Sequence, residues 1–350
     1  MAKTIFRKKK YRARRIILVL AALLLVALIA WALISTFSTE DEYVSETNRS
    51  DETVQTPGAS DDAEDLPAIQ DSSSNPESQG RKPLPKEFID RNTYSPHVVL
   101  YDVESNEILY SKNAEEKCYP ASLTKLLTAL VALDYADTDT AMTLGNELYM
   151  ISPGSSTAYL QVGTKLTMEQ LLQALLLPSG NDAAYAIAVQ VGRIIADDPD
   201  MDRYAAKDLF LEKMNEKAKK LGCTKSNFAN PDGYHKNDHY TTAQDMLYIA
   251  RAAIKNATIK EIISTKKVTV HFLSGGSATW QNSNRLLSET DNYYYEGAFG
   301  LKTGTTDEAG KCLAACATRD GHTSIAVVMG SEYENGRWDD CRGLLDLSFQ

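Results

Sequence analysis

A serine and a lysine stand three residues apart in the segment PASLTK, where Ser122 and Lys125 directly precede the apolar run 126–133. Residues at i and i+3 of a helix share one face, so the two side chains should meet at the start of a helix. A serine hydroxyl is a weak nucleophile until a base takes its proton, and a lysine withdrawn from water can be neutral enough to do so. The pair therefore predicts a serine nucleophile with a lysine base.

The same spacing occurs a second time, at Ser264 and Lys267. No apolar run follows this copy and no companion motif accompanies it. We interpret it as a solvated helix end.

Two further short polar motifs interrupt apolar segments. Ser179 and Asn181 follow a strongly apolar stretch and precede a helical pattern, so a tight connection should present both side chains. Lys302, Thr303 and Gly304 close an apparent strand, where a glycine would let a substrate backbone approach the strand edge. Each motif alone could be an ordinary loop or strand end.

Together and in this order, the three motifs resemble the Ser-x-x-Lys, Ser-x-Asn and Lys-Thr-Gly set of the penicillin-recognising serine enzymes. The chain resembles one family among them more closely, the D-alanyl-D-alanine carboxypeptidases, which are the low-molecular-mass penicillin-binding proteins. The segments that carry this resemblance are PASLTKLLT at 120–128, PSGNDA at 178–183, FANPDG at 228–233, HYTTA at 239–243, NSNRLL at 282–287 and GLKTGTT at 300–306. The resemblance extends from Tyr94 to Phe349.

The resemblance implies a catalytic role for each matching residue. Ser122 would be the acylated nucleophile and Lys125 its base. Ser179 would relay a proton or contact the leaving group, and Asn181 would hydrogen-bond the substrate peptide. The backbone N–H groups of Ser122 and Thr305 would form an oxyanion hole.

A binding site for the terminal carboxylate of the substrate is also implied. Lys302, Thr303 and Arg337 would hold this group, and Gly304 would let the substrate come close. Arg337 follows a strand that we expect to end at Gly330, where family members carry a carboxylate-binding arginine. An ordinary surface arginine is the other interpretation.

In such a family the substrate would be a peptidoglycan stem peptide that ends in D-Ala-D-Ala. Attack by Ser122 on the carbonyl before the last residue would expel that D-Ala and leave an acyl-enzyme, which water then cleaves. A β-lactam antibiotic presents a strained amide beside a similar carboxylate, so it should acylate the same serine. We expect neither a cofactor nor a metal ion in this chemistry.

Other functions stay open on the sequence. A D,D-endopeptidase that cuts peptidoglycan crosslinks would use the same residues. A β-lactamase is disfavoured because we find no convincing Glu-x-x-x-Asn segment that could position a deacylating water. From a different class, the chain could be a β-lactam sensor or a non-catalytic wall-binding protein.

Strand patterns lie at both ends of the globular region, with helical patterns between them. We expect strands at 97–102, 107–111, 267–272, 298–302, 312–317 and 323–329, and helices at 121–133, 168–177, 183–195, 204–221, 242–254 and 338–347. This order predicts an α/β (α+β) fold like that of DD-peptidases and β-lactamases. Its antiparallel sheet would be built from both ends of the domain, with an inserted helical region.

Charge and composition divide the chain into four parts. Residues 1–15 carry 8 Lys/Arg and no acid, and the uncharged stretch 16–37 is long enough to cross the hydrocarbon of a bilayer. Residues 38–87 are acidic, rich in Ser, Thr and Pro and poor in aromatics, which predicts a disordered linker. Residues 88–350 should form the catalytic domain.

We therefore expect a single-pass membrane anchor, with the basic segment in the cytoplasm and the catalytic domain extracellular or periplasmic. A cleaved signal peptide is the other interpretation, because Ala30 and Ala32 form a small-x-small site around Trp31. The net charge of −10 argues against a nucleic-acid partner, since the one basic cluster adjoins the apolar stretch.

Five cysteines are an odd and small number for a chain of 350 residues, so we expect buried thiols and no disulfide framework. His235 and His239 stand four residues apart near Asp232, a spacing that could suggest a metal pair. They lie in a loop rich in Gly, Asn and Asp with no further ligand in view. We expect no metal site there.

Overall fold

The computed structural model describes residues 69–71 and 84–350, which belong to one compact unit from Gly58 to Gln350. The basic segment 1–15 and the expected anchor 16–37 lie outside the described residues. Among the helices described, none is both long and apolar enough to cross a membrane.

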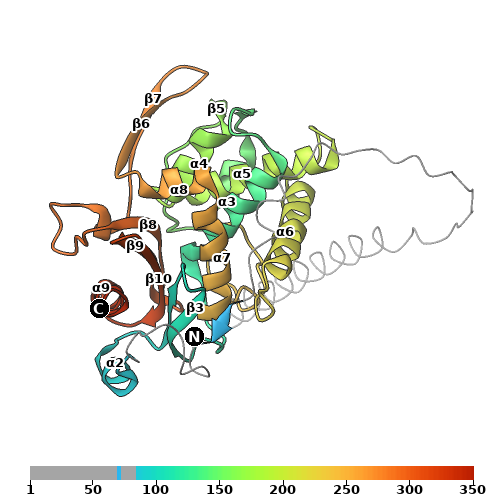
Figure 1. Ribbon diagram of the computed structural model, residues 1–350. Helices are drawn as coiled ribbons and strands as arrows, with labels where there is room; N and C mark the ends of the chain where they lie inside the picture. The colour runs from blue at the N-terminus through green and yellow to red at the C-terminus, as the bar shows by residue number, and fades with distance from the viewer. Residues whose placement is uncertain (1–68, 72–83) are drawn as a thin grey trace, which may run out of the picture. The chain divides into compact units, whose positions relative to one another are not determined.

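The central sheet has five antiparallel strands and one short parallel strand, in the order β1-β3-β2-β10-β9-β8 (Figure 1). Strands β2 and β3 come from the N-terminal part of the body, and β8, β9 and β10 come from its C-terminal part. The bounds are β1 Gln70–Asp71, β2 His97–Asp102, β3 Glu107–Lys112, β8 Ala298–Thr306, β9 Gly310–Arg319 and β10 His322–Ser331. β2 pairs with β10, Leu100 lying opposite Ala326. The predicted sheet assembled from both ends is confirmed.

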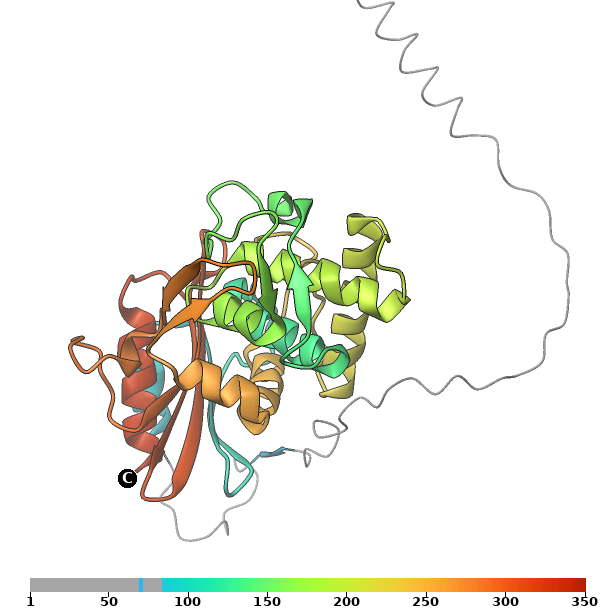
Figure 2. The same cartoon turned by 90° about the horizontal axis from the view of Figure 1, so that it is seen from above.

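Side chains alternate between the two faces of the sheet, and each face is covered. Val98 and Leu100 of β2 belong to one apolar cluster, together with residues of α2 (Lys86–Asn92) and α9 (Gly336–Ser348). Val99 of the same strand belongs to the other cluster, which the middle helices complete. Figure 2 shows α9 and α2 on one side of the sheet and the middle helices on the other.

The inserted helical region is built around α3 (Thr124–Tyr135), whose residues from Thr124 to Ala132 are all buried. Helices α4, α5, α6 and α7 all contact α3. The bounds in this region are α4 Met168–Leu176, α5 Asn181–Ala196, α6 Arg203–Lys220, α7 Ala243–Lys255 and α8 Ala257–Ser264. A helix enclosed in this way holds its first turn firmly, and that turn carries Lys125.

Several small elements complete the described body. Two hairpins pair β4 (Ala141–Thr143) with β5 (Lys165–Thr167) and β6 (Lys267–His271) with β7 (Ser277–Gln281). Three short 3-10 helices are η3 Ala121–Leu123, η4 Asn146–Met150 and η5 Arg285–Leu287. The expected strand at 267–272 is present, and its partner β7 was not predicted.

Two elements fall within the segment 38–87 that we expected to be a linker. β1 (Gln70–Asp71) pairs in parallel with β3, Gln70 opposite Glu107, and α2 begins at Lys86. Pairing at a sheet edge uses backbone N–H and C=O groups that nearly every sequence offers. The polar composition of the segment therefore could not indicate this strand.

The sequence had suggested that the Lys-Thr-Gly motif closes its strand, and this prediction is wrong. β8 continues to Thr306, with Gly304 opposite Cys312 and Thr306 opposite Gly310. All five cysteines are free and buried, as predicted, and Cys316 lies on the same strand as Cys312.

Candidate active site

Ser122 lies in η3, the single 3-10 turn that leads into α3. The residue before it, Ala121, has a φ of 47°, in the left-handed region that non-glycine residues rarely adopt. Gly233, with a φ of 84°, packs so closely on this turn that a Cβ there would overlap the Ala121 carbonyl. A Cβ at Gly304 of β8 would lie 3.1 Å from the Ser122 nitrogen. The close approach that we expected a substrate to make at Gly304 is made by the chain's own turn.

The Lys125 side chain is fully buried, and its Nζ lies 2.8 Å from Ser122 Oγ, 2.7 Å from Asn181 Oδ1 and 2.7 Å from the Asp232 carbonyl oxygen. Burial lowers the pKa of Lys125 to about 8, against the opposite pull of the carboxylates of Asp232 and Asp182. The amide and carbonyl oxygens can only accept hydrogen bonds. A neutral amine would therefore donate its two N–H groups to them and turn its lone pair to the Ser122 hydroxyl.

The Ser-Gly-Asn motif forms the turn that starts α5. Ser179 has a φ of 64°, and its carbonyl accepts a hydrogen bond of 2.6 Å from Ser156 Oγ. Asn181 begins the helix, and its amide nitrogen donates to Ser155 Oγ at 2.9 Å. Within the described residues the Ser179 hydroxyl makes no hydrogen bond. The structure thus joins Asn181 directly to Lys125 and places Ser179 two residues away in the same turn.

Lys302 and Thr303 are buried in the middle of β8. Burial, and then the neighbouring cations Lys125 and Arg337, hold the pKa of Lys302 well below its usual range. Lys302 Nζ donates to the Thr303 carbonyl at 3.1 Å, and Thr303 Oγ1 lies 2.8 Å from Ser283 Oγ. Lys302 thus lies close enough to the other two cations to be affected by their charge.

Arg337 reaches β8 from the first turn of α9. Its Nη1 donates to the Gly304 carbonyl at 2.9 Å and to Thr305 Oγ1 at 2.8 Å. The guanidinium also lies 4.8 Å from the centre of the Trp338 ring. Arg337 is half-buried against the strand, so it is not the freely solvated surface arginine that the sequence had left open.

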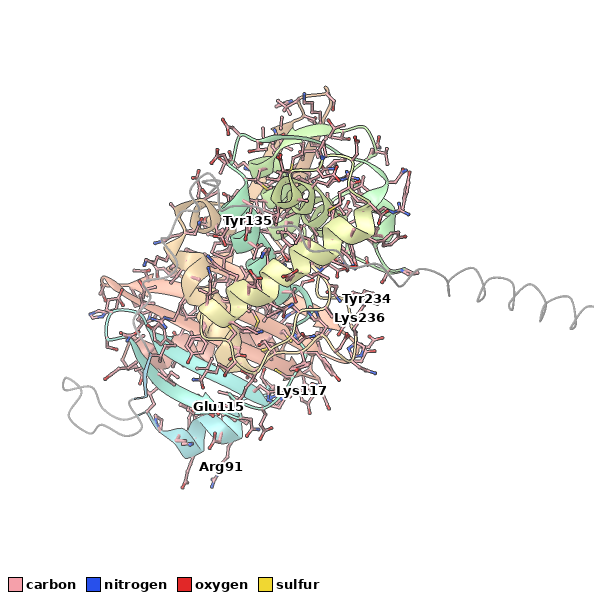
Figure 3. All side chains as sticks on the ribbon, turned by 90° about the vertical axis from the view of Figure 1, so that its right-hand side faces the viewer. Arg91, Glu115, Lys117, Tyr135, Tyr234 and Lys236 are labelled. Atoms are coloured by element: carbon pink, nitrogen blue, oxygen red, sulfur yellow. The ribbon has the colours of Figure 1, made fainter. Side chains whose placement is uncertain are left out.

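Ser122, Asn181 and Thr305 line one cavity of about 420 Å³. Tyr234 also lines it, and Figure 3 shows Tyr234 and Lys236 close together on the loop that follows the close-packed glycine. Residues from all three predicted motif regions thus lie in or next to one hollow.

Comparison with known proteins supports the family resemblance that the three motifs suggested, and it does so over the larger part of the chain. The sequence profile of the D-alanyl-D-alanine carboxypeptidases matches residues 86–333. The chain belongs to the D-alanyl-D-alanine carboxypeptidase family.

Members of the family from several bacteria are similar to this chain. The D-alanyl-D-alanine carboxypeptidase of Streptomyces sp. (strain K15) is 35% identical over 250 residues, which cover 69% of this chain and 82% of the relative. DacF of Bacillus subtilis is 31% identical over 254 residues, 72% of this chain and 61% of DacF. The crystal structure of the Streptomyces K15 DD-transpeptidase matches with a TM-score of 0.67 at 34% identity, covering 73% of this chain and 97% of that one.

Several residues that support the site were not singled out from the sequence. Asp182 Oδ1 and Oδ2 accept the backbone N–H groups of Ala158 and Leu160, at 2.8 and 3.0 Å, and so fix the loop that carries Ser155. Asp182 lies inside the segment PSGNDA, which was the available signal. Ser155 offered none, because its loop meets the site only in the folded chain.

One member of the suggested metal pair, His239, has no free ring nitrogen for a metal ion. His239 Nδ1 accepts the backbone N–H of Ala229 at 3.0 Å, and its Nε2 lies 2.8 Å from Thr124 Oγ1. Both ring nitrogens are thus occupied. The His235 ring instead packs edge-on against Tyr119, with 4.6 Å between ring centres.

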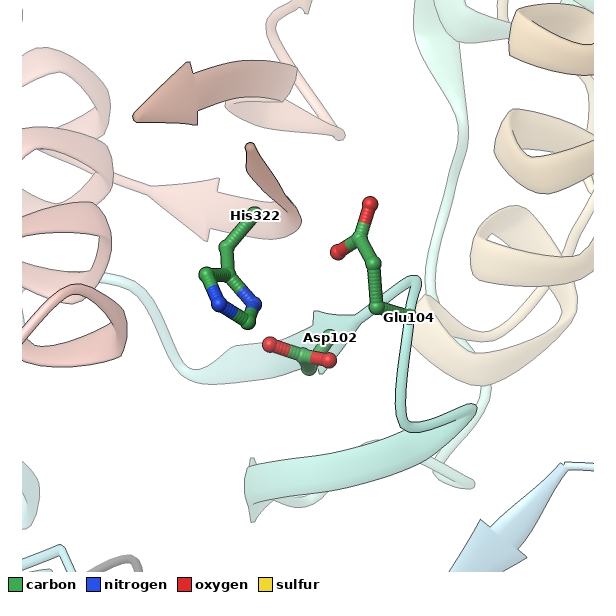
Figure 4. Close-up of side chains that lie close together, drawn as sticks. All are labelled: Asp102, Glu104 and His322. Atoms are coloured by element: carbon green, nitrogen blue, oxygen red, sulfur yellow. The ribbon is translucent and has the colours of Figure 1, made fainter. Parts of the chain in front are cut away.

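A different group of side chains with possible metal ligands lies where β2 ends and β10 begins (Figure 4). Asp102, Glu104 and His322 bring one ligand atom each to within 4.8 Å of one another. Glu104 Oε2 accepts the backbone N–H of Thr323 at 2.7 Å, and Asp102 Oδ1 accepts that of Ser105 at 2.8 Å. These bonds tie the β2–β3 turn to the start of β10, which gives the group a structural role.

Proposed function

We propose that this chain is a serine-type D-Ala-D-Ala carboxypeptidase, which removes the terminal D-Ala from peptidoglycan stem pentapeptides through an acyl-enzyme. The observation that carries the proposal is the Lys125 Nζ, 2.8 Å from Ser122 Oγ and otherwise bonded only to oxygen acceptors. Because the other two partners cannot donate, the neutral amine has one direction left for its lone pair. It then takes the Ser122 proton as the oxygen attacks.

The attacked carbonyl develops negative charge, which needs hydrogen-bond donors that are already in place. The backbone N–H groups of Ser122 and Thr305 would supply them, since Gly304 brings β8 against the η3 turn. Collapse of the tetrahedral intermediate breaks the peptide bond, the departing D-Ala nitrogen takes a proton, and Ser122 keeps the acyl group. Water then hydrolyses the ester and restores the serine.

The terminal carboxylate of the substrate would lie toward Arg337, Lys302 and Thr303. The guanidinium of Arg337 is already fixed on β8 by Gly304 and Thr305. Lys302 has a lowered pKa without a substrate, and an incoming carboxylate would favour its ammonium form, because an opposite charge stabilises the charged state. This pairing would select substrates with a free carboxylate next to the cleaved bond.

β-Lactam antibiotics would be inhibitors for the same reason. Such a molecule offers an amide and a carboxylate in a similar relation, so Ser122 would open the ring. The leaving nitrogen stays tethered to the acyl group, and the acyl-enzyme would persist.

Release of D-Ala tests the proposal. The chain is incubated with a stem pentapeptide that ends in D-Ala-D-Ala, and free D-Ala is measured over time. We expect release by the wild type and a loss of at least about 1,000-fold in Ser122→Ala, because the acylated atom is gone. No release by the wild type, or undiminished release by Ser122→Ala, would reject the proposal.

A D,D-endopeptidase is the second candidate, since the same nucleophile would cleave a crosslinked peptide. A related solved structure is that of a DD-transpeptidase, a name that describes transfer of the acyl group to an amine in that protein. Crosslinked dimers and pentapeptides are therefore offered in parallel, with and without glycine as an amine acceptor. Faster cleavage of dimers would favour the endopeptidase, and a glycine adduct would reveal transfer.

We also propose that an N-terminal anchor holds the catalytic domain 88–350 at the outer face of the cell membrane. The proposal rests on the 8 Lys/Arg of residues 1–15 and on the uncharged stretch that follows. Fractionation of cells that make the full chain, or a chain without residues 1–37, tests it. The full chain should sediment with membranes and its body should be open to protease from outside; a full chain in the soluble fraction would contradict this.

A further inference from the structure

His239 is a buried histidine beside the nucleophile that the mechanism above does not use. Its Nδ1 accepts the backbone N–H of Ala229 at 3.0 Å, so the ring hydrogen must be on Nε2. Burial lowers the pKa of His239 to about 3, and the imidazole is neutral at any pH at which the chain would work. The Phe228 ring packs edge-on against it, with 5.6 Å between ring centres. The tautomer and the orientation of the ring are both fixed.

The Nε2–H of His239 points to the hydroxyl of Thr124, 2.8 Å away. Thr124 Oγ1 accepts from the histidine and donates its own hydrogen to the carbonyl oxygen of Ala121 at 2.8 Å. All three groups are buried. A chain of hydrogen bonds with one direction thus runs from the loop 228–243 to the peptide bond between Ala121 and Ser122.

That peptide bond also carries the Ser122 N–H. In a trans peptide the C=O and the N–H point in opposite directions from one rigid plane. Whatever holds the Ala121 carbonyl therefore also aims the Ser122 N–H toward the opposite side. The left-handed φ of 47° at Ala121 is unfavourable for a non-glycine residue, so this plane needs hydrogen bonds to hold it. The Ala121 carbonyl accepts the backbone N–H of Thr124 and, in addition, the Thr124 hydroxyl.

We propose that His239 and Thr124 are positioning residues, which aim the Ser122 N–H at the developing oxyanion by holding the Ala121 carbonyl. The inference rests on the proposed function, in which Ser122 is the acylated residue. Neither side chain lines the cavity, and both are buried. Their loss should slow acylation and leave substrate binding largely intact, because the donor matters most when charge develops on the substrate oxygen.

The test compares Thr124→Val with Thr124→Ser in the full chain. Valine has nearly the shape of threonine without the hydroxyl, whereas serine keeps it. Acylation by a chromogenic β-lactam is followed under pre-steady-state conditions, which separates the dissociation constant from the acylation rate constant. We expect Thr124→Val to lower the rate constant about 10- to 100-fold, with the dissociation constant within about threefold of wild type. Thr124→Ser should recover most of the rate.

Thr128→Val is the matched control, one turn further along α3. Its buried hydroxyl donates to the Pro231 carbonyl at 2.6 Å, in the same loop, and has no contact with the Ala121 carbonyl. This variant should lose comparable thermal stability and keep acylation within about threefold of wild type.

His239→Gln and His239→Leu give a second comparison, in which Thr124 itself is left unchanged. A glutamine amide can donate to the Thr124 hydroxyl, and leucine cannot. We expect His239→Gln to be acylated about tenfold faster than His239→Leu. The pH at which the acylation rate is half-maximal should be unchanged in both variants, because Lys125 remains the base.

A wild-type acylation rate in folded Thr124→Val, or an equal loss of rate in Thr128→Val, would overturn the inference. So would equal rates in His239→Gln and His239→Leu. Failure of the wild type itself to be acylated would instead reject the proposed function, and the inference with it.

Discussion

At the scale of single residues, the partners of Lys125 decide which species does the chemistry. An ammonium can donate to all three surrounding oxygens, whereas the neutral amine must leave one direction for its lone pair. The sequence predicted the Ser122–Lys125 pair because a spacing of three residues is local to one helix. It did not indicate Asp232 as a partner, because a carbonyl 107 positions away comes into contact only through folding.

The pH dependence of acylation follows from the pKa of Lys125. With this pKa at about 8, the neutral amine is the minor form below pH 8 and the major form above it. We expect the acylation rate constant to rise with pH through a midpoint near 8, measured with a β-lactam that does not itself titrate in this range. A rate that falls as the pH rises through 8 would contradict the role of Lys125 as base.

Replacement of Asp232 should move this midpoint. Its carboxylate raises the pKa of Lys125, so Asp232→Asn is expected to shift the midpoint toward lower pH. The asparagine side-chain oxygen can still accept the backbone N–H of Tyr234. Measurement of the acylation rate from pH 5.5 to 10 checks this, and a shift toward higher pH would show that the charge of Asp232 does not act on Lys125 in this way.

Arg337 allows a test of carboxylate binding. Arg337→Gln should lower kcat/KM for D-Ala-D-Ala peptides by about 10- to 100-fold, the value of a hydrogen bond between charged groups, mainly through KM. Arg342→Gln, on the same helix but bonded to the Asn292 carbonyl, is the control and should stay within about twofold of wild type. A similar loss of kcat/KM in both variants would mean that Arg337 only stabilises helix α9 and does not bind the carboxylate.

At the scale of elements, the site depends on how the loop 228–243 and strand β8 pack against the η3 turn. The sequence predicted the helix at 121–133 and a strand at 298–302. It could not predict that Gly233 and Gly304 both pack against the turn that carries Ser122, since this close packing depends on backbone positions in three separate segments. The strand was also predicted too short, because a glycine weakens the interior of a strand and Gly304 was therefore interpreted as its end.

Gly233→Ala tests the packing of the loop on the turn. The added Cβ would overlap the Ala121 carbonyl and would also meet a φ of 84°, so we expect acylation to fall more than about tenfold and the free energy of unfolding by more than about 1 kcal/mol. Gly275→Ala is the control. Gly275 has a φ of 89° with no atom within 4 Å of the added Cβ, and this variant should lose about 1 kcal/mol at most and acylate like the wild type. Equal acylation in both variants would contradict the expected overlap.

At the scale of the whole molecule, the sheet joins the two ends of the described body. The gathering of strand patterns at both ends predicted this arrangement. The order of the strands could not be predicted, because it depends on which strand edges pair in the folded chain. Asp340 of α9 strengthens the connection, since its carboxylate accepts the backbone N–H groups of Tyr94 and Ser95 at 2.9 and 2.8 Å.

Asp340→Ala should therefore destabilise the molecule as a whole. It would leave two backbone N–H groups without their acceptor, at a cost of about 2–4 kcal/mol in the free energy of unfolding, measured by urea denaturation. Asp339→Ala removes an exposed carboxylate from the same turn and should change this free energy by less than about 0.5 kcal/mol. Equal stability of the two variants would contradict the role of Asp340 in joining α9 to the segment that precedes β2.

The most direct measurement is mass spectrometry of the full chain after treatment with benzylpenicillin, with proteolysis to locate the modified peptide. We expect one equivalent of added mass, carried by the peptide that contains Ser122 and absent from Ser122→Ala. An adduct on another serine, or none on the folded wild-type chain, would contradict the assignment of Ser122 as the nucleophile.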